Sequence, residues 1–302
     1  MKSHSSEMRR ARPLLGTLVE IGAAGENAAP AIDAAFDEIA AVHRLMSFHE
    51  AESDVSRLNR APLATPLEVD PRTYEVLSWA QRMSALSGGA FDVTVGAKLV
   101  ALGFLPAPNA EGPSGGDTSF RDVRLLPEHR VSLCSRVWID LGGIAKGYAV
   151  DRAIEALKRN GVEDGVVNAG GDLRVFGAPQ PIHLRHPEDP ARLLFLGPLS
   201  DTAIASSSGC FIEQSEAGDQ PDPLVDPRHK TALRWQQSVT VIASRCVVAD
   251  ALTKIVRIAP RRAARILPEL GAEAIVIDRR GARRLAAAVG EAHADRMIGA
   301  ET

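Results

Sequence analysis

The sequence holds few of the residues that mark several whole classes of protein, cysteine first among them. Its 302 residues include three cysteines, Cys134, Cys210 and Cys246, with no C-x-x-C spacing. An odd count at such wide spacing argues against a disulfide framework, a redox pair or a zinc site. We therefore interpret all three as buried or free thiols, which fits a reducing compartment.

Aromatic residues and unbalanced charge are also scarce. Aromatic residues make up 4 % of the chain, and the formal net charge is -3. A nucleic-acid surface needs clustered positive charge and stacking aromatic rings, and an anionic membrane surface also attracts basic segments. The composition therefore excludes neither enzymes nor binding proteins, but it gives no reason to expect nucleic acid or membrane as a partner.

Long apolar runs are missing as well. No run approaches the ~18 apolar residues of a membrane span, and the N-terminal stretch "PLLGTLVEIG" is interrupted by Pro13, Gly16 and Glu20. A signal peptide needs an unbroken apolar segment, which this region lacks. We expect a cytoplasmic protein without a membrane span.

The hydrophobic share of 45 % and charged share of 24 % are ordinary for a soluble protein with a real core. Helical periodicity predicts helices at 31–46, 72–86, 146–159 and 247–259. Strands are expected at 16–23, 130–134, 136–141, 182–187, 192–197, 202–208 and 238–244, with strand–turn–strand units at 165–177 and 274–286. Residues 103–119 and 218–230 are rich in proline and glycine or irregular, and indicate loops. Several neighbouring strands have no helix between them, so an α+β fold is favoured over a doubly wound parallel sheet.

The stretch "IDLGGIAKGYAVD" combines Asp140, Gly142, Gly143 and Lys146 where a strand is expected to meet a helix. Glycines allow close backbone approach, and the N-terminus of a helix favours phosphate. It matches neither G-x-x-x-x-G-K-[ST] nor G-x-G-x-x-G. On its own it indicates either a phosphate site or a plain turn with a solvated lysine.

Two further segments leave two interpretations open. Asp92, in "SGGAFDVTVG", either caps a helix or holds a ligand hydroxyl. In "VNAGGDLRVFG", the pair Gly170-Gly171 beside Asn168 suits either close backbone approach to a ligand or a bare β-turn.

The segment "VVADALTKIV" places Asp250 near an expected helix start, with Thr253 and Lys254 one turn further on. A carboxylate with nearby hydroxyl or carbonyl oxygens suits Mg²⁺. The alternative is an acidic residue that complements the helix dipole.

In their order along the chain these segments resemble a known family. "LLGTLVEI", "LMSFHEAESDVSRLNR", "SGGAFDVTVG", "DLGGIAKGYAVD", "VNAGGDLRVFG" and "ADALTK" together are similar to the ApbE family of FAD:protein FMN transferases, over about residues 14–258. The resemblance implies a single α+β domain spanning residues 1–302, an alpha-beta roll of mostly antiparallel sheets covered by helices. It also implies FAD as substrate and Mg²⁺ as cofactor.

The expected activity is transfer of the FMN moiety of FAD to a threonine, or sometimes serine, hydroxyl of a target flavoprotein, with release of AMP. Some relatives instead hydrolyse FAD to FMN and AMP. The resemblance assigns metal ligation to the Gly143 carbonyl and Asp250, with Thr253 or the Lys254 position beside them. It assigns contact with FAD to Leu15, Phe48, Ala90, Phe91, Asp92, Asp140, Lys146, Asn168, Gly170, Gly171 and Val225.

The chain departs from the family pattern at two places. Where the family has His-Ile-Ile-Asp-Pro-Arg-Thr-Gly, with a histidine proposed to activate the acceptor, this chain has "PLVDPRHK", so Pro223 replaces the histidine. Proline transfers no proton, which leaves His229, Asp226 or Asp250 as candidate bases. The second departure is Lys254, where many relatives have threonine.

Three activities therefore remain open from the sequence. The chain is expected to transfer FMN to a cytoplasmic flavoprotein. One alternative is an FAD pyrophosphatase, which would release AMP without forming protein-bound flavin. The other is a non-catalytic flavin-binding protein, which would bind FAD, release no AMP and form no protein-bound flavin.

Overall fold

A computed structural model describes residues 7–108, 112–113, 118–187, 189, 191–208, 224–233, 237–278 and 281–286. The loops predicted at 103–119 and 218–230 lie partly outside these residues, and Pro223 and Cys210 lie outside them entirely. Within the described part of the chain, no helix is long and apolar enough to cross a membrane.

The strands are mostly short. They are β1 (Glu7–Leu14), β2 (Thr17–Ala24), β3 (Leu67–Glu68), β4 (Val123–Leu126), β5 (Arg130–Leu133), β6 (Gly165–Ala169), β7 (Asp172–Phe176), β8 (Gln180–Arg185), β9 (Leu193–Leu199), β10 (Thr202–Ser208), β11 (Val225–Asp226), β12 (Thr231–Ala232), β13 (Ser238–Ala243), β14 (Glu273–Asp278) and β15 (Gly281–Ala286).

The helices alternate irregularly with these strands. They are α1 (Ala28–Met46), α2 (Asp54–Arg60), α3 (Pro71–Ser87), α4 (Gly96–Ala101), α5 (Ala145–Arg159), α6 (Cys246–Ile258) and α7 (Pro260–Glu269), with short 3-10 turns η1 (Val93–Val95) and η2 (Phe120–Asp122).

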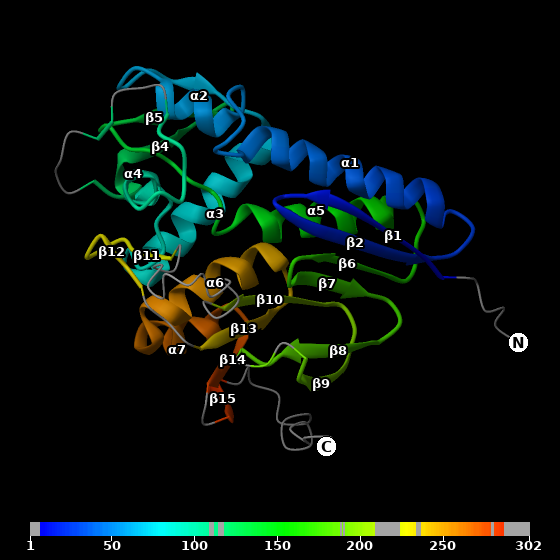
Figure 1. Ribbon diagram of the computed structural model, residues 1–302. Coiled ribbons are helices and arrows are strands. Elements are labelled where there is room, and N and C mark those ends of the chain that lie inside the picture. Colours follow the sequence, from blue (N-terminus) through cyan, green and yellow to red (C-terminus); the bar gives the residue numbers. More distant parts are fainter. Residues whose placement is uncertain are drawn as a thin grey trace, which may run out of the picture.

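One large sheet organises the molecule, in the order β1-β2-β6-β7-β10-β13-β14-β15 (Figure 1). Each neighbouring pair described in it is antiparallel. Helices α1, α5 and α6 pack on this sheet and on one another. The antiparallel sheet covered by helices confirms the α+β fold, while the single domain inferred from the resemblance stays a prediction.

The two faces of the sheet bury different apolar clusters, and strand β14 shows why. Ala274 and Val276 point into the main core with the helices, whereas Ile275 and Ile277 belong to a smaller cluster. That cluster includes Ile182 of β8, so the β8–β9 hairpin covers the second face. Alternate residues of a strand point to opposite faces, which explains the division.

A smaller sheet, in the order β3-β5-β4, lies with α2 and α4 away from the large sheet (Figure 1). Helix α3 contacts both regions, through β4 on one side and α6 on the other. The segment between β5 and α5 therefore runs from the small sheet to the large one.

Most predicted elements are confirmed, including the helices that became α1, α3, α5 and α6 and the hairpin of β6 and β7. The strand predicted at 136–141 is wrong. Its backbone groups pair with residues outside any strand instead: Ile139 N donates to the side chain of Asn59 in α2 at 2.7 Å, and Asp140 N donates to the carbonyl of Val93 in η1 at 2.8 Å. The backbone N–H groups of this apolar, extended segment thus have hydrogen-bond partners without a neighbouring strand. Its sequence pattern is still that of a strand.

Candidate active site

A cavity of about 640 Å³ opens where the large sheet, the small-sheet region and the start of α5 meet. Its walls come from the β1–β2 turn, the end of α1, the segment 90–95, the segment 140–146, β11 and α6. Ten of the residues assigned from the sequence line it: Leu15, Phe48, Ala90, Phe91, Asp92, Asp140, Gly143, Lys146, Val225 and Lys254. Segments far apart in the chain thus form one concave site of a size suited to a small molecule.

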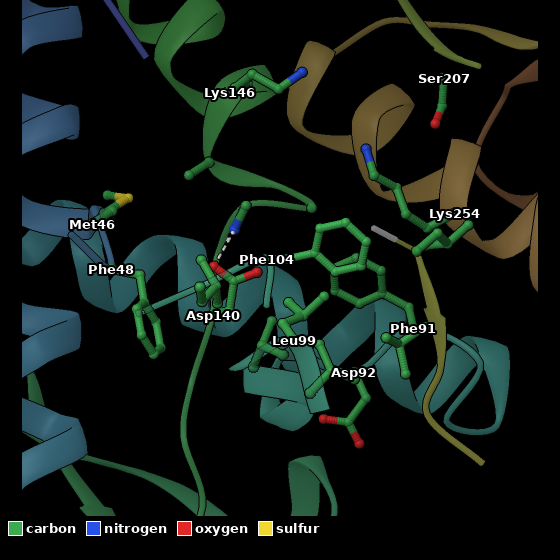
Figure 2. Close-up of a pocket in the computed structure, with 18 of the residues that line it drawn as sticks. Met46, Phe48, Phe91, Asp92, Leu99, Phe104, Asp140, Lys146, Ser207 and Lys254 are labelled. Carbon is green, nitrogen blue, oxygen red and sulfur yellow. Dashed lines mark hydrogen bonds between the residues drawn. The ribbon is translucent and has the colours of Figure 1, made fainter. Parts of the chain in front are cut away.

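The segment before α5 presents Asp140 to this cavity. The backbone of Asp140 is held by Val93, and its Oδ1 accepts a hydrogen bond of 3.2 Å from Gly142 N (Figure 2). Burial raises the pKa of the Asp140 carboxyl above its usual range. The helix then begins at Ala145, so its N-terminus also faces the cavity.

The Asp92 carboxylate is occupied by hydrogen bonds from nearby protein groups. Its Oδ1 accepts from the backbone N and the hydroxyl of Thr94, at 2.8 and 2.7 Å, and its Oδ2 accepts from Phe120 N at 2.8 Å. Asp92 thereby caps the 3-10 turn η1, so the capping interpretation is confirmed. In Figure 2 its carboxylate points away from Lys146 and Lys254.

The opposite end of the cavity is basic, with Lys146 of α5 and Lys254 and Arg257 of α6 in its wall. Lys146 Nζ donates to Asp172 Oδ2 at 2.8 Å, and the Asp172 side chain is only 2 % exposed. Burial alone would lower the pKa of Lys146, but the Asp172 and Asp250 carboxylates outweigh burial and raise it. The lysine is therefore charged at neutral pH.

The pKa of Asp172 is set by two opposing effects, burial beside a second carboxylate and the attraction of two ammonium groups. Burial and the nearby Asp250 carboxylate raise its pKa, the Lys146 and Lys254 ammonium groups oppose them, and the pKa is raised to about 6. Two buried carboxylates thus lie behind two ammonium groups that reach the cavity wall.

The rest of the cavity is apolar. Phe48, Leu99 and Phe104 line it, and in Figure 2 Phe48 lies on the other side of Asp140 from Lys254. Leu15 joins the wall from the β1–β2 turn with a positive φ of 55°. A leucine in this conformation is strained, and such strain often accompanies a functional site.

The residues assigned to a metal do not present an open set of oxygen ligands. Asp250 Oδ1 accepts a hydrogen bond from Lys254 Nζ, and Asp250 Oδ2 accepts one from Gly147 N at 3.0 Å. The Thr253 hydroxyl donates to the Asp250 backbone carbonyl at 2.7 Å. Among the described residues there is no group of three or more His, Cys, Asp or Glu side chains suited to a metal ion. As they stand, these residues do not fit a divalent cation.

Asp250 is not the residue that complements the start of α6, because it lies in the second turn of that helix. Asp151 of α5 has that role. Its two carboxylate oxygens accept from Cys246 N and Val247 N, each at 3.0 Å, and it also pairs with Arg174 at 2.7 Å. An acceptor from another helix thus satisfies the first N–H groups of α6.

Asp226, the last residue of β11, is in contact with His229, three residues further on. Asp226 Oδ2 lies 2.9 Å from His229 Nδ1, and Arg228 pairs with the same carboxylate. Burial alone would raise the pKa of Asp226, but hydrogen bonds from Arg228 and His229 lower it to about 2. Neither Asp226 nor His229 lines the cavity, although Val225 and Pro227 do.

Asn168, Gly170 and Gly171 also lie outside the cavity lining. Asn168 Oδ1 accepts from Gly171 N at 3.0 Å, and both glycines have positive φ in the two-residue turn between β6 and β7. These contacts match the β-turn interpretation. Their assignment to FAD contact stays a prediction.

Several cavity residues escaped sequence reasoning. Ser207, Arg257 and Phe104 line the cavity but carried no motif, and Asp172, which binds Lys146 from behind, was not among the assigned residues. Arg257 NH1 donates to Ser207 Oγ at 2.9 Å. The spacing of Asp250, Lys254 and Arg257 on one helix face was the one available signal for part of this group.

Comparison with known proteins identifies the family. The ApbE family model matches residues 15–276, so the chain belongs to the ApbE family. It is 29 % identical over 227 residues to an FAD:protein FMN transferase of Vibrio cholerae, covering 70 % of this chain and 68 % of that protein.

Solved structures of ApbE proteins are similar in fold to this chain. An ApbE protein of Thermotoga maritima has a TM-score of 0.77 and 28 % identity, covering 92 % of this chain and 97 % of that one. The apo form of the Pseudomonas stutzeri flavinyl transferase ApbE has a TM-score of 0.80 and 20 % identity, covering 94 % and 96 %.

Proposed function

We propose that this chain is an FAD:protein FMN transferase that uses the cavity to bind FAD. The observation that carries the proposal is the division of the cavity lining between apolar side chains and the ammonium groups of Lys146 and Lys254. FAD has the same division, with a flat flavin ring at one end and a doubly charged pyrophosphate further along. Membership of the ApbE family and the similarity to named FMN transferases support the same activity.

The flavin ring is placed against Phe48, Leu99 and Phe104, where apolar surface excludes water. The pyrophosphate is placed against Lys146 and Lys254, close to the N-terminus of α5. Positive charge and helix N-termini both stabilise phosphate, so this end of the cavity is the site of the reaction.

The reaction joins an acceptor hydroxyl to the FMN phosphorus. The hydroxyl oxygen attacks that phosphorus, the bond to the bridging oxygen breaks, and the bridging oxygen leaves with AMP. The hydroxyl proton passes to a base. Fixed ammonium groups stabilise the negative charge that builds up on the departing phosphate.

His229 is the base that the contacts favour. Its side chain is 69 % exposed, so an acceptor protein reaches it, and its Nδ1 contacts Asp226. A carboxylate that binds one ring nitrogen orients the ring and leaves Nε2 to accept a proton. Pro227, two residues earlier, lines the cavity, so His229 follows a segment that borders the proposed FAD site.

The acceptor is a flavoprotein whose target hydroxyl belongs to threonine or serine, as the resemblance implies, and the cytoplasm stays the predicted location. The resemblance also implies Mg²⁺ as a cofactor, and nothing in the described residues supports that implication. The described donor set does not fit it, and no step above depends on a metal.

In-gel flavin fluorescence tests the proposal. The chain, FAD and an acceptor flavoprotein from the same genome are mixed, and a second acceptor carries valine in place of its target threonine. Fluorescence on the first acceptor band alone supports transfer. Fluorescence on neither band, with FAD cleaved to AMP, would instead favour an FAD pyrophosphatase.

A paired variant links transfer to the basic end of the cavity. Lys146→Met combined with Asp172→Asn removes the ammonium group without leaving a buried, unpaired carboxylate. We expect at least a tenfold loss of FAD affinity, since a hydrogen bond to a charged group contributes about 1.5–3 kcal/mol. Lys158→Met, on the exposed end of α5, is the matched control and should bind FAD like the wild type.

A further inference from the structure

Lys254 places a positive charge at the point where the resemblance predicts a divalent cation. It follows Asp250 by four residues in α6, so both side chains lie on the same face of the helix. Lys254 Nζ bonds Asp250 Oδ1. The Lys254 side chain also passes beside Gly143, since a Cβ atom on Gly143 would lie 3.7 Å from Lys254 Cε. Gly143 and Asp250 are the two residues assigned to the metal.

The burial of this pair fixes its geometry. The Asp250 side chain is 0 % exposed, and its second oxygen is held by Gly147 N at 3.0 Å. The Lys254 side chain is 17 % exposed and lines the cavity. A carboxylate anchored on one side by backbone thus directs the ammonium group on its other side toward the ligand.

Lys146 repeats the arrangement from α5. Its ammonium group is bonded to buried Asp172 and reaches the same cavity. Figure 2 shows the side chains of Lys146 and Lys254 entering the view from different helices, with their ammonium groups at the same end. Two fixed ammonium groups match the two phosphates of a dinucleotide in charge and number.

We propose that Lys254, anchored by Asp250, is the resident cation of this site, so that this chain cleaves FAD without a divalent metal. The inference rests on the proposed function, because it takes the FAD pyrophosphate as the group bound by Lys254 and Lys146. Lys254 contacts the phosphate that leaves with AMP and stabilises its charge, while Asp250 positions Lys254. A divalent cation in the same place would be repelled by the ammonium group and would have to displace it from Asp250.

Binding of Mn²⁺, followed by its electron paramagnetic resonance signal, tests the inference without using activity. Mn²⁺ is titrated into the protein with FAD present, and into FAD alone as the blank. We expect no protein-bound Mn²⁺ in the wild type and about one equivalent in Lys254→Thr, which restores a hydroxyl oxygen and removes the ammonium group. One equivalent bound by the wild type and lost in Asp250→Asn would overturn the inference.

Turnover gives a second, independent measurement. AMP release by the wild type should change less than twofold when EDTA is added. Lys254→Met should reduce it at least 100-fold with or without Mg²⁺, while Lys158→Met should match the wild type. Loss of wild-type turnover in EDTA and its recovery with Mg²⁺ would overturn the inference.

The two measurements separate this inference from the proposed function. If the chain releases no AMP under any condition, the proposed transferase activity fails, yet the Mn²⁺ titration still reports whether Lys254 excludes a divalent cation. Thermal unfolding of Lys254→Met and Lys254→Thr serves as the control that both variants are folded in the Mn²⁺ titration and in the AMP-release assay.

Discussion

Gly147 N donates a hydrogen bond of 3.0 Å to Asp250 Oδ2, and a Cβ atom on Gly147 would lie 2.7 Å from the Asp250 Cβ atom. Helices α5 and α6 therefore meet so closely here that only glycine fits. The same approach brings Lys146 and Lys254, one from each helix, to one cavity. The third glycine of "GGIAKG", Gly147, thus serves helix packing rather than phosphate contact.

Gly147→Ala should destabilise the protein by about 1–3 kcal/mol, because the added methyl group overpacks a buried contact with helix backbone. The free energy of unfolding in urea measures the effect. Lys158→Ala, in the same helix, removes only an exposed contact with Phe176 and should cost less than about 1 kcal/mol. Equal stability of the two variants would contradict the close approach of α5 and α6.

Asp151→Ala should cost about 3–5 kcal/mol of stability, since it removes a fully buried carboxylate and leaves its partner Arg174 without it. The variant also leaves two N–H groups at the start of α6 without their acceptor. Guanidinium unfolding measures the loss. A cost below about 1 kcal/mol would show that Asp151 does not stabilise the start of α6.

His229→Ala should reduce kcat for FMN transfer by roughly 100-fold, the usual contribution of a general base. FAD affinity should stay unchanged, because His229 does not line the cavity. His183→Ala, at an exposed position of β8 beside Phe195, is the matched control. Unchanged transfer by His229→Ala would remove His229 from the mechanism and leave Asp226 or Asp250 as the base.

Asp226 should stabilise the protein above about pH 4 and lose this effect as the pH falls through about 2. Its folded-state pKa is lowered to about 2, against about 3.9 for an unperturbed aspartate. A lowered folded pKa means that the unfolded state takes up the proton first, so acid removes the stabilisation. Urea midpoints of wild type and Asp226→Asn should differ at pH 6 and converge near pH 2. A constant difference would contradict the Arg228 and His229 contacts.

Local patterns predicted α1, α3, α5, α6 and most strands because burial there follows simple periodicity, whereas α2, α4 and α7 were missed. In α6, for example, the buried residues include Val247, Ala251 and Ile255, which recur every four positions along the helix. Strand β1 was missed because "EMRRARPL" is an exposed edge strand with almost no apolar alternation. The strand predicted at 136–141 was wrong because its partners, Asn59 of α2 and Val93 of η1, are distant in the sequence and belong to no strand, which no local pattern reveals.

The candidate site was predictable only where the residues stood in a recognisable order. Lys146 and Asp140 carried a glycine motif, and Asp250 and Lys254 shared a helix face. Asp172 gave no sign of its salt bridge, because the contact depends on how the β6–β7 hairpin packs against α5. The sequence also could not show that Asn168 lies outside the cavity lining, where its side chain accepts a hydrogen bond within the β6–β7 turn, because this position depends on tertiary packing.

The ratio of AMP released to FMN attached to the acceptor tests the central claim most directly. Both products are quantified in one time course, by chromatography for AMP and by intact mass for the acceptor. Transfer predicts that they rise together in a one-to-one ratio and that AMP stays near the blank when the acceptor is left out. AMP formed equally without acceptor, or FAD bound and left uncut, would contradict the account.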